Sequence, residues 1–97
     1  MAYDPGAIDA TLAAAVGDEP ALIAELREAF LDGVKRCLEG LKQADSPDSW
    51  TASALRLKGL AASFGAIRLM ALASEAAGAT PHDNAVLRKL HRAIERL

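Results

Sequence analysis

The sequence predicts an all-α fold, in which four helices form an antiparallel up-and-down bundle and a short extra helix precedes them. Hydrophobic residues make up 52% of the 97 residues and aromatic residues only 4%, so aliphatic side chains and alanine must build the core. Alanine is also the strongest helix former. Apolar residues recur at helical spacing, and no segment alternates with the period of two that indicates a strand. Short connections between long amphipathic segments favour antiparallel neighbours in a bundle.

The length and charge of the chain exclude several classes of protein. A chain of 97 residues forms a single domain, 1–97, and is too short for a large α/β enzyme with a deep pocket. A net charge of −2 argues against binding nucleic acid mainly through phosphate contacts. A single cysteine, Cys37, excludes an intramolecular disulfide and a cysteine-based zinc site. The chain shows neither a signal peptide nor an apolar run of the about 20 residues that a membrane span needs, so we expect a cytoplasmic protein without membrane contact.

Prolines and glycines predict where the helices begin and end. A proline at the first helical position costs no hydrogen bond, because the N–H that it lacks would have no partner inside the helix. Each proline follows a capping context, given in turn by Asp4, by Asp18 with Glu19, by Ser46 and by Thr80. We expect Thr80 and Asp83 to form a capping box at the last of these starts. Gly17, Gly65 and Gly78 are the expected stops beyond the helix ends.

These boundaries define five helices, predicted over residues 5–16, 19–44, 47–64, 66–77 and 81–97. The second helix has a stripe of apolar residues at helical spacing, formed by Ile23, Leu26, Phe30, Val34, Cys37 and Leu41. Leu22, Leu31 and Leu38 widen the stripe, so this helix should contact more than one neighbour. The last helix has its apolar residues in line at Leu87, Leu90, Ile94 and Leu97.

The third predicted helix has an apolar face and a second, unusual face. At 100° per residue, its core side consists of Trp50, Ala54, Leu57, Ala61 and Phe64. Leu55 lies more than a right angle from the centre of that side, so we expect it to be exposed. Around it lie Ala52, Gly59 and Ala62, with Lys58 and Arg56 at the edges. A glycine inside a helix costs about 1 kcal/mol relative to alanine, so an outward Gly59 indicates close approach of another surface.

Residues 50–66 read W-T-A-S-A-L-R-L-K-G-L-A-A-S-F-G-A. This segment resembles the signature of the histidine-containing phosphotransfer (HPt) domain, W-x-x-A-A-H-x-L-K-G-[SA]-[SA]-x-x-[LFI]-G-A. The matches include, at the family's spacing, Leu57, Lys58, Gly59, Ala61, Phe64, Gly65 and Ala66. The helix order is similar as well, so the resemblance covers essentially the whole chain. It implies an HPt-like bundle in a bacterial-type two-component phosphorelay.

Leu55 departs from the HPt signature at the position of the phospho-accepting histidine. Leucine has no nitrogen nucleophile, so we expect no phosphotransfer activity and no catalytic residue. Leu60 also stands where the family usually has serine or alanine. Lys58 matches the lysine that in the family helps to neutralise phosphoryl charge, and it can still pair with the acidic pocket of a receiver domain. The expected partner-binding residues are Leu55, Arg56, Lys58, Gly59, Ala62 and Ala52.

These observations favour a pseudo-HPt module that binds a response-regulator receiver domain or a histidine kinase without carrying phosphate. One alternative is an active phosphotransfer protein, in which His82 or His91 accepts phosphate or Leu55 replaces a natural histidine. Another is a structural bundle that forms homodimers through the patch around Leu55. We expect a monomer rather than a dimer and no cofactor. We also expect no metal site, because the two histidines are nine residues apart and face different sides of a helix.

Overall fold

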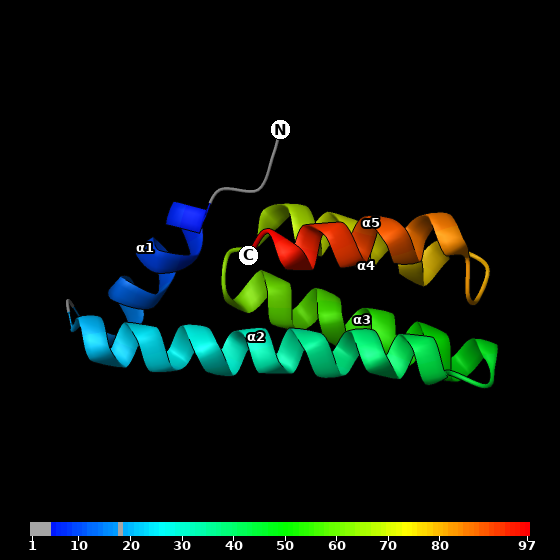
Figure 1. Ribbon diagram of the computed structural model, residues 1–97, viewed down its shortest axis with the longest axis horizontal. Helices are drawn as coiled ribbons and strands as arrows, with labels where there is room; N and C mark the ends of the chain where they lie inside the picture. The colour runs from blue at the N-terminus through cyan, green and yellow to red at the C-terminus, as the bar shows by residue number, and fades with distance from the viewer. Residues whose placement is uncertain (1–4, 18) are drawn as a thin grey trace.

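The computed structural model describes residues 5–17 and 19–97, and these residues form five α-helices and no strand (Figure 1). The all-α prediction is therefore confirmed for the described part of the chain. In chain order the helices are α1 (Pro5–Val16), α2 (Pro20–Gln43), α3 (Pro47–Ser63), α4 (Ile67–Gly78) and α5 (Asn84–Glu95). None of these five helices is long and apolar enough to cross a bilayer.

Helices that follow one another in the chain pack against one another. α2 is the longest helix and runs along the longest dimension of the molecule, with α3 beside it (Figure 1). α3 contacts both α2 and α4, whereas α5 packs on α4 and less extensively on α2. α1 folds back over the first turns of α2 and contacts no other helix within the described residues (Figure 1). Most of the core lies between α2, α3, α4 and α5, and α1 contributes Leu12 to it.

The core confirms the predicted inward faces of α2 and α3. Trp50 and Leu57 are fully buried, and Phe64 beyond the end of α3 packs against the core. The ring of Phe64 lies 4.6 Å from that of Phe30 on α2, measured between centroids. Cys37 is 8% exposed and fills the core as a small apolar side chain. The largest fully buried side chains come from α2 to α5, and they are Trp50, Phe30, Leu41, Leu57, Leu69, Leu90 and Val34.

Two glycines of α2 allow α3 to approach closely. A Cβ atom at Gly33 would lie 3.0 Å from Cδ2 of Leu60, and one at Gly40 would lie 3.0 Å from Oγ of Ser53. Both distances are shorter than an ordinary van der Waals contact, so an alanine at either position would need α3 side chains to move. The missing side chain of Gly33 thus makes room for Leu60.

The predicted starts of α2 and α3 agree with the structure to within one residue. Ser46 caps α3 as expected, because its Oγ accepts a 3.1 Å hydrogen bond from the N–H of Ser49. The Ser49 hydroxyl oxygen accepts from the N–H of Ser46 at 3.2 Å and completes a capping box. Glu19 is the N-cap of α2 but makes no side-chain capping bond. The predicted caps Asp4 and Asp18 lie outside the described residues.

The predicted glycine stops are confirmed at two of three positions. Gly17 and Gly65 have φ angles of +78° and +71°, the left-handed conformation that glycine adopts without a steric penalty. Gly78 was predicted to be the third stop, and this prediction is wrong. Gly78 is the last residue inside α4, and the helix ends because Ala79 is extended, with φ −89° and ψ 163°.

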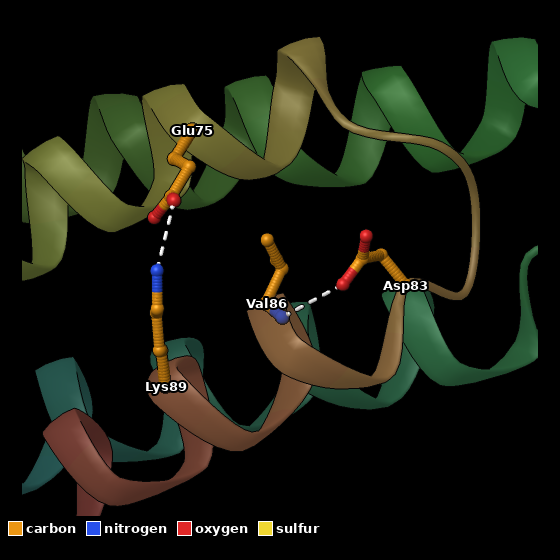
Figure 2. Close-up of polar contacts among 4 residues, drawn as sticks. All are labelled: Glu75, Asp83, Val86 and Lys89. Atoms are coloured by element: carbon orange, nitrogen blue, oxygen red, sulfur yellow. Dashed lines mark hydrogen bonds and ion pairs between the residues drawn. The ribbon is translucent and has the colours of Figure 1, made fainter.

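The predicted start of the last helix is also wrong. α5 begins at Asn84 instead of residue 81, and its N-cap is Asp83, whose Oδ1 accepts a 3.1 Å hydrogen bond from the N–H of Val86 (Figure 2). The N–H of Asp83 donates a 3.1 Å hydrogen bond to the backbone carbonyl oxygen of Thr80, in a turn, and Asp83 itself is the N-cap of α5, so the two residues form no capping box. The reason is His82, whose φ of +63° interrupts the helix before Asp83.

Candidate functional site

The six residues predicted to bind a partner are all exposed on α3. We call them the α3 face, which consists of Ala52, Leu55, Arg56, Lys58, Gly59 and Ala62. Leu55 is 51% exposed, whereas Leu57 two residues later is fully buried. Among the described residues, Leu55 and Ile67 are the exposed large hydrophobic side chains. The exposure predicted for Leu55 is therefore confirmed.

Trp50 fixes the orientation of the α3 face. Its side chain is 0% exposed, and its Nε1 donates a 2.8 Å hydrogen bond to the carbonyl oxygen of Ala76 on α4. A rotation of α3 that buried Leu55 would expose this indole and break its buried hydrogen bond. Losing such a hydrogen bond costs about 0.5–1.5 kcal/mol, in addition to the apolar surface of the indole that would become exposed. The outward direction of Leu55 is thus a consequence of the anchoring of Trp50 in the core.

Gly59 has no packing role within the described chain. A Cβ atom built at Gly59 would meet no atom within 4 Å, in contrast to the glycines of α2. Its carbonyl oxygen accepts a 2.9 Å hydrogen bond from Oγ of Ser63, one turn later on the exposed surface. The cost of a helical glycine, about 1 kcal/mol against alanine, is therefore not offset by any close approach of two helices. The position leaves open space on the α3 face beside Leu55.

Positive charge surrounds Leu55. Arg56 and Lys58 are exposed, and neither forms an ion pair with a described carboxylate. Burial raises the pKa of the Cys37 thiol, and the charges of Arg56 and Arg36 partly offset that rise. Both arginines therefore lie near Cys37, on the α2 side of the α3 face. The position of Arg36 near this face could not be predicted from the sequence, because helical periodicity does not tell which neighbour the flank of α2 contacts.

Neither histidine belongs to α3. His82 lies in the loop between α4 and α5, where its Nε2 is 2.6 Å from the carbonyl oxygen of Ala44. That carbonyl can only accept, so Nε2 is the donor. The ring also packs on Trp50, with 5.5 Å between ring centroids. His91 lies exposed on α5 with Nδ1 3.2 Å from Oε1 of Glu95. Each histidine thus has local partners, and the described residues contain no group of three potential metal ligands.

Comparisons with protein-family models, with curated proteins and with solved structures found no match for this chain. The function of the α3 face is therefore inferred from its own residues and from the resemblance of residues 50–66 to the HPt signature. What these residues offer chemically is an apolar side chain, open backbone and unpaired cations on one exposed surface.

Proposed function

We propose that this chain is a pseudo-HPt module of a two-component phosphorelay, a cytoplasmic domain that binds a response-regulator receiver domain or a histidine kinase without carrying phosphate. In this proposal α2 to α5 form the antiparallel up-and-down four-helix bundle of HPt domains, and α1 is the short extra helix. Three features support it: the order of the helices, the packing of each helix on the next, and the HPt-like residues 50–66.

The observation that carries the proposal is the 51% exposure of Leu55 at the centre of the α3 face. An apolar side chain inside a polar rim is a common form of interface hot spot. Arg56 and Lys58 provide a positive rim that complements the acidic pocket of a receiver domain. The open space at Gly59 lets the backbone of α3 come close to a partner.

The same face explains why we propose binding without catalysis. The HPt reaction needs an imidazole nitrogen that takes a phosphoryl group from an aspartyl phosphate and later gives it up. The side chain of Leu55 offers only C–H groups at that position. Leu55 is therefore a contact residue of the interface. The free domain is a monomer that either competes with an active phosphotransfer protein for its partner or holds a signalling complex together.

A phosphotransfer assay on a variant that has histidine at position 55 tests the proposal. The chain and its Leu55→His variant are mixed separately with a panel of receiver domains that carry labelled phosphate. We expect the variant to take up acid-labile label and the parent chain to take up none. Ala52→His is the matched control, because Ala52 is exposed on the same face but does not occupy the signature position. We expect this control to remain unlabelled.

Binding is measured in parallel by calorimetry with the unphosphorylated receiver domains. We expect one-to-one binding that Leu55→Asp or Lys58→Glu weakens by roughly tenfold or more. If Leu55→His takes no label from any receiver and neither substitution alters binding, the proposal is wrong. A concentration-dependent mass of the chain alone, abolished by Leu55→Asp, would then favour the self-associating bundle. Label on the parent chain would instead identify another acceptor.

A further inference from the structure

The last helix is basic in a chain that is otherwise acidic. Residues 84–97 contain four arginine and lysine residues and one glutamate. Residues 1–83 contain seven arginine and lysine residues and twelve aspartate and glutamate residues. The net charge of −2 is therefore the sum of a negative charge on residues 1–83 and a positive charge on residues 84–97. Such a local field attracts anionic groups even when the whole chain is slightly negative.

Three arginines form a row along the exposed side of α5 and its C-cap. Arg88, Arg92 and Arg96 follow one another at a spacing of four residues, and all three are exposed. Like charges at this spacing destabilise a helix by a few tenths of a kcal/mol per pair. Arg68 of α4 adds a fourth cation, because it lines a small hollow together with Arg92 and Arg96. We call Arg88, Arg92 and Arg96 the arginine row.

Two carboxylates near α5, those of Glu75 and Glu95, contact residues outside the arginine row. Lys89 reaches across to Glu75 of α4, with 3.0 Å between Nζ and Oε1 (Figure 2). Glu95 faces His91 on the same helix, as described above. No carboxylate of a described residue forms an ion pair with the arginine row. No ion pair with a described carboxylate therefore relieves the repulsion within the row, although the C-terminal end of the helix dipole favours Arg92 and Arg96.

Beside the arginine row, a groove of about 520 Å³ separates α5 from α2. Its apolar lining consists of Leu31, Leu38, Ile94 and Leu97. Lys42 stands on the rim of this groove and also lines an adjoining hollow with Leu87, Arg88 and Arg92. Leu31 and Leu97 are only partly buried, because α5 packs less extensively on α2 than on α4. The rim of the groove itself has mixed charge, with Lys35, Lys42, Glu39 and Glu95, and the excess of positive charge lies in the adjoining hollow, where Arg88 and Arg92 join Lys42.

We propose that this groove and the arginine row bind an acidic amphipathic segment of a partner protein. Its apolar side chains enter the groove between α2 and α5, and its carboxylates pair with Arg88, Arg92 and Lys42. α5 has 12 residues and is about 18 Å long, so a segment of about three helical turns covers it. This mode of binding places the apolar face of a helix in a groove and uses charges to set its direction.

The features of the groove argue against other anionic partners. The apolar side chains of Leu31, Leu38, Ile94 and Leu97 favour a partner that brings apolar side chains of its own over the phosphates of a nucleic acid. The exposed large hydrophobic side chains of the described residues, Leu55 and Ile67, belong to α3 and α4. α5 therefore has no exposed apolar anchor for a bilayer beside its arginines. An amphipathic segment can place apolar side chains in the groove and carboxylates toward Lys42, Arg88 and Arg92 of the adjoining hollow, whereas a nucleic acid has no apolar side chains for the groove.

This binding surface shares no residue with the α3 face, so the inference stands independently of the proposed function. The test uses a labelled synthetic helix of about 14 residues, with leucines at helical spacing and glutamates elsewhere, and measures its fluorescence anisotropy with the intact chain. A control peptide has glutamine in place of every glutamate. We expect the acidic peptide to bind at least roughly tenfold more tightly than the control, and its affinity to fall as salt is added.

Two pairs of charge reversals locate the binding surface. The Arg88→Glu/Arg92→Glu variant should weaken binding of the acidic peptide by at least roughly tenfold. The Arg56→Glu/Lys58→Glu variant makes the same change in net charge on the α3 face, and it should leave the peptide affinity unchanged within about twofold. Leu31→Glu, which puts a carboxylate into the groove, should weaken binding as well. Circular dichroism of each variant checks that the helices are retained.

Three results would overturn the inference. The first is equal binding of the acidic and the glutamine peptides, or no binding of either. The second is equal loss of affinity in the two charge-reversal variants, which would indicate attraction without a site. The third is tighter binding of a DNA duplex or of phosphatidylserine vesicles than of the peptide, with the same dependence on Arg88 and Arg92. That outcome would assign the arginine row to another class of partner.

Discussion

Glycine serves two different purposes on the facing helices α2 and α3. At Gly33 and Gly40 the missing Cβ atoms make room for Leu60 and Ser53, so these glycines belong to the packing of α3 on α2. At Gly59 a Cβ atom would meet nothing within 4 Å, so the described chain gains nothing from the glycine there. A residue that weakens its helix without serving the core is expected where a partner needs access to the backbone.

The contrast leads to a prediction for Gly59→Ala. Because alanine is the better helix former and meets no neighbour, the substitution should raise the free energy of unfolding by about 0.5–1 kcal/mol. It should at the same time weaken binding of a receiver domain, since the added methyl group occupies the open space on the α3 face. Urea denaturation and calorimetry measure the two effects. Gly33→Ala is the control that should not stabilise the fold, and unchanged receiver affinity of Gly59→Ala would remove Gly59 from the interface.

At the scale of helices, the sequence predicts where a helix begins when the residues that cap it lie close together in the chain. Ser46 followed by a proline gave the start of α3 correctly, because the capping hydrogen bonds involve residues three apart. The start of α5 could not be predicted in this way. His82 adopts a left-handed conformation while its ring meets the Ala44 carbonyl oxygen and Trp50, and both partners are more than thirty residues away in the chain. Propensity and spacing contain no information on such a contact.

The cap of α5 gives a prediction that separates the two candidate starts. Asp83→Ala removes the acceptor of the Val86 N–H and should lower the free energy of unfolding by about 1 kcal/mol. Thr80→Ala removes no side-chain capping bond of α5 and should cost less than about 0.5 kcal/mol. Both values come from urea denaturation followed by circular dichroism. A larger loss at Thr80 than at Asp83 would return the helix start to residue 81.

At the scale of the whole molecule, the two candidate surfaces differ in how far the sequence can reveal them. The α3 face follows from one helix, because the period of 3.6 residues places Leu55 away from Trp50 and Leu57. The groove between α2 and α5 depends on how far two helices separate, and that distance results from the packing of all helices on one core. The spacing of Arg88, Arg92 and Arg96 can be read from the sequence. That they form no ion pair with a described carboxylate can be seen only once the positions of α4 and α2 are known.

Cys37 offers a probe of the whole fold, because it lies in the core that α2 shares with α3. Burial raises the pKa of its thiol above the ordinary value of 9.0, so the unfolded chain loses the thiol proton at a lower pH than the folded chain. Below the ordinary value both states hold the proton, and the thiol adds no pH dependence. As the pH rises through that value, the unfolded state is favoured and stability is lost.

We therefore expect the free energy of unfolding to fall more steeply between about pH 8 and about pH 10 in the parent chain than in a Cys37→Ala variant. Urea titrations at several pH values measure both slopes. The comparison uses slopes instead of absolute values, because alanine also leaves a small cavity that lowers stability at every pH. All other titratable groups are common to both proteins, so their contributions cancel in the difference. Parallel curves would mean that the thiol is not buried in the folded molecule, and that the inward stripe of α2 does not close on α3 as described.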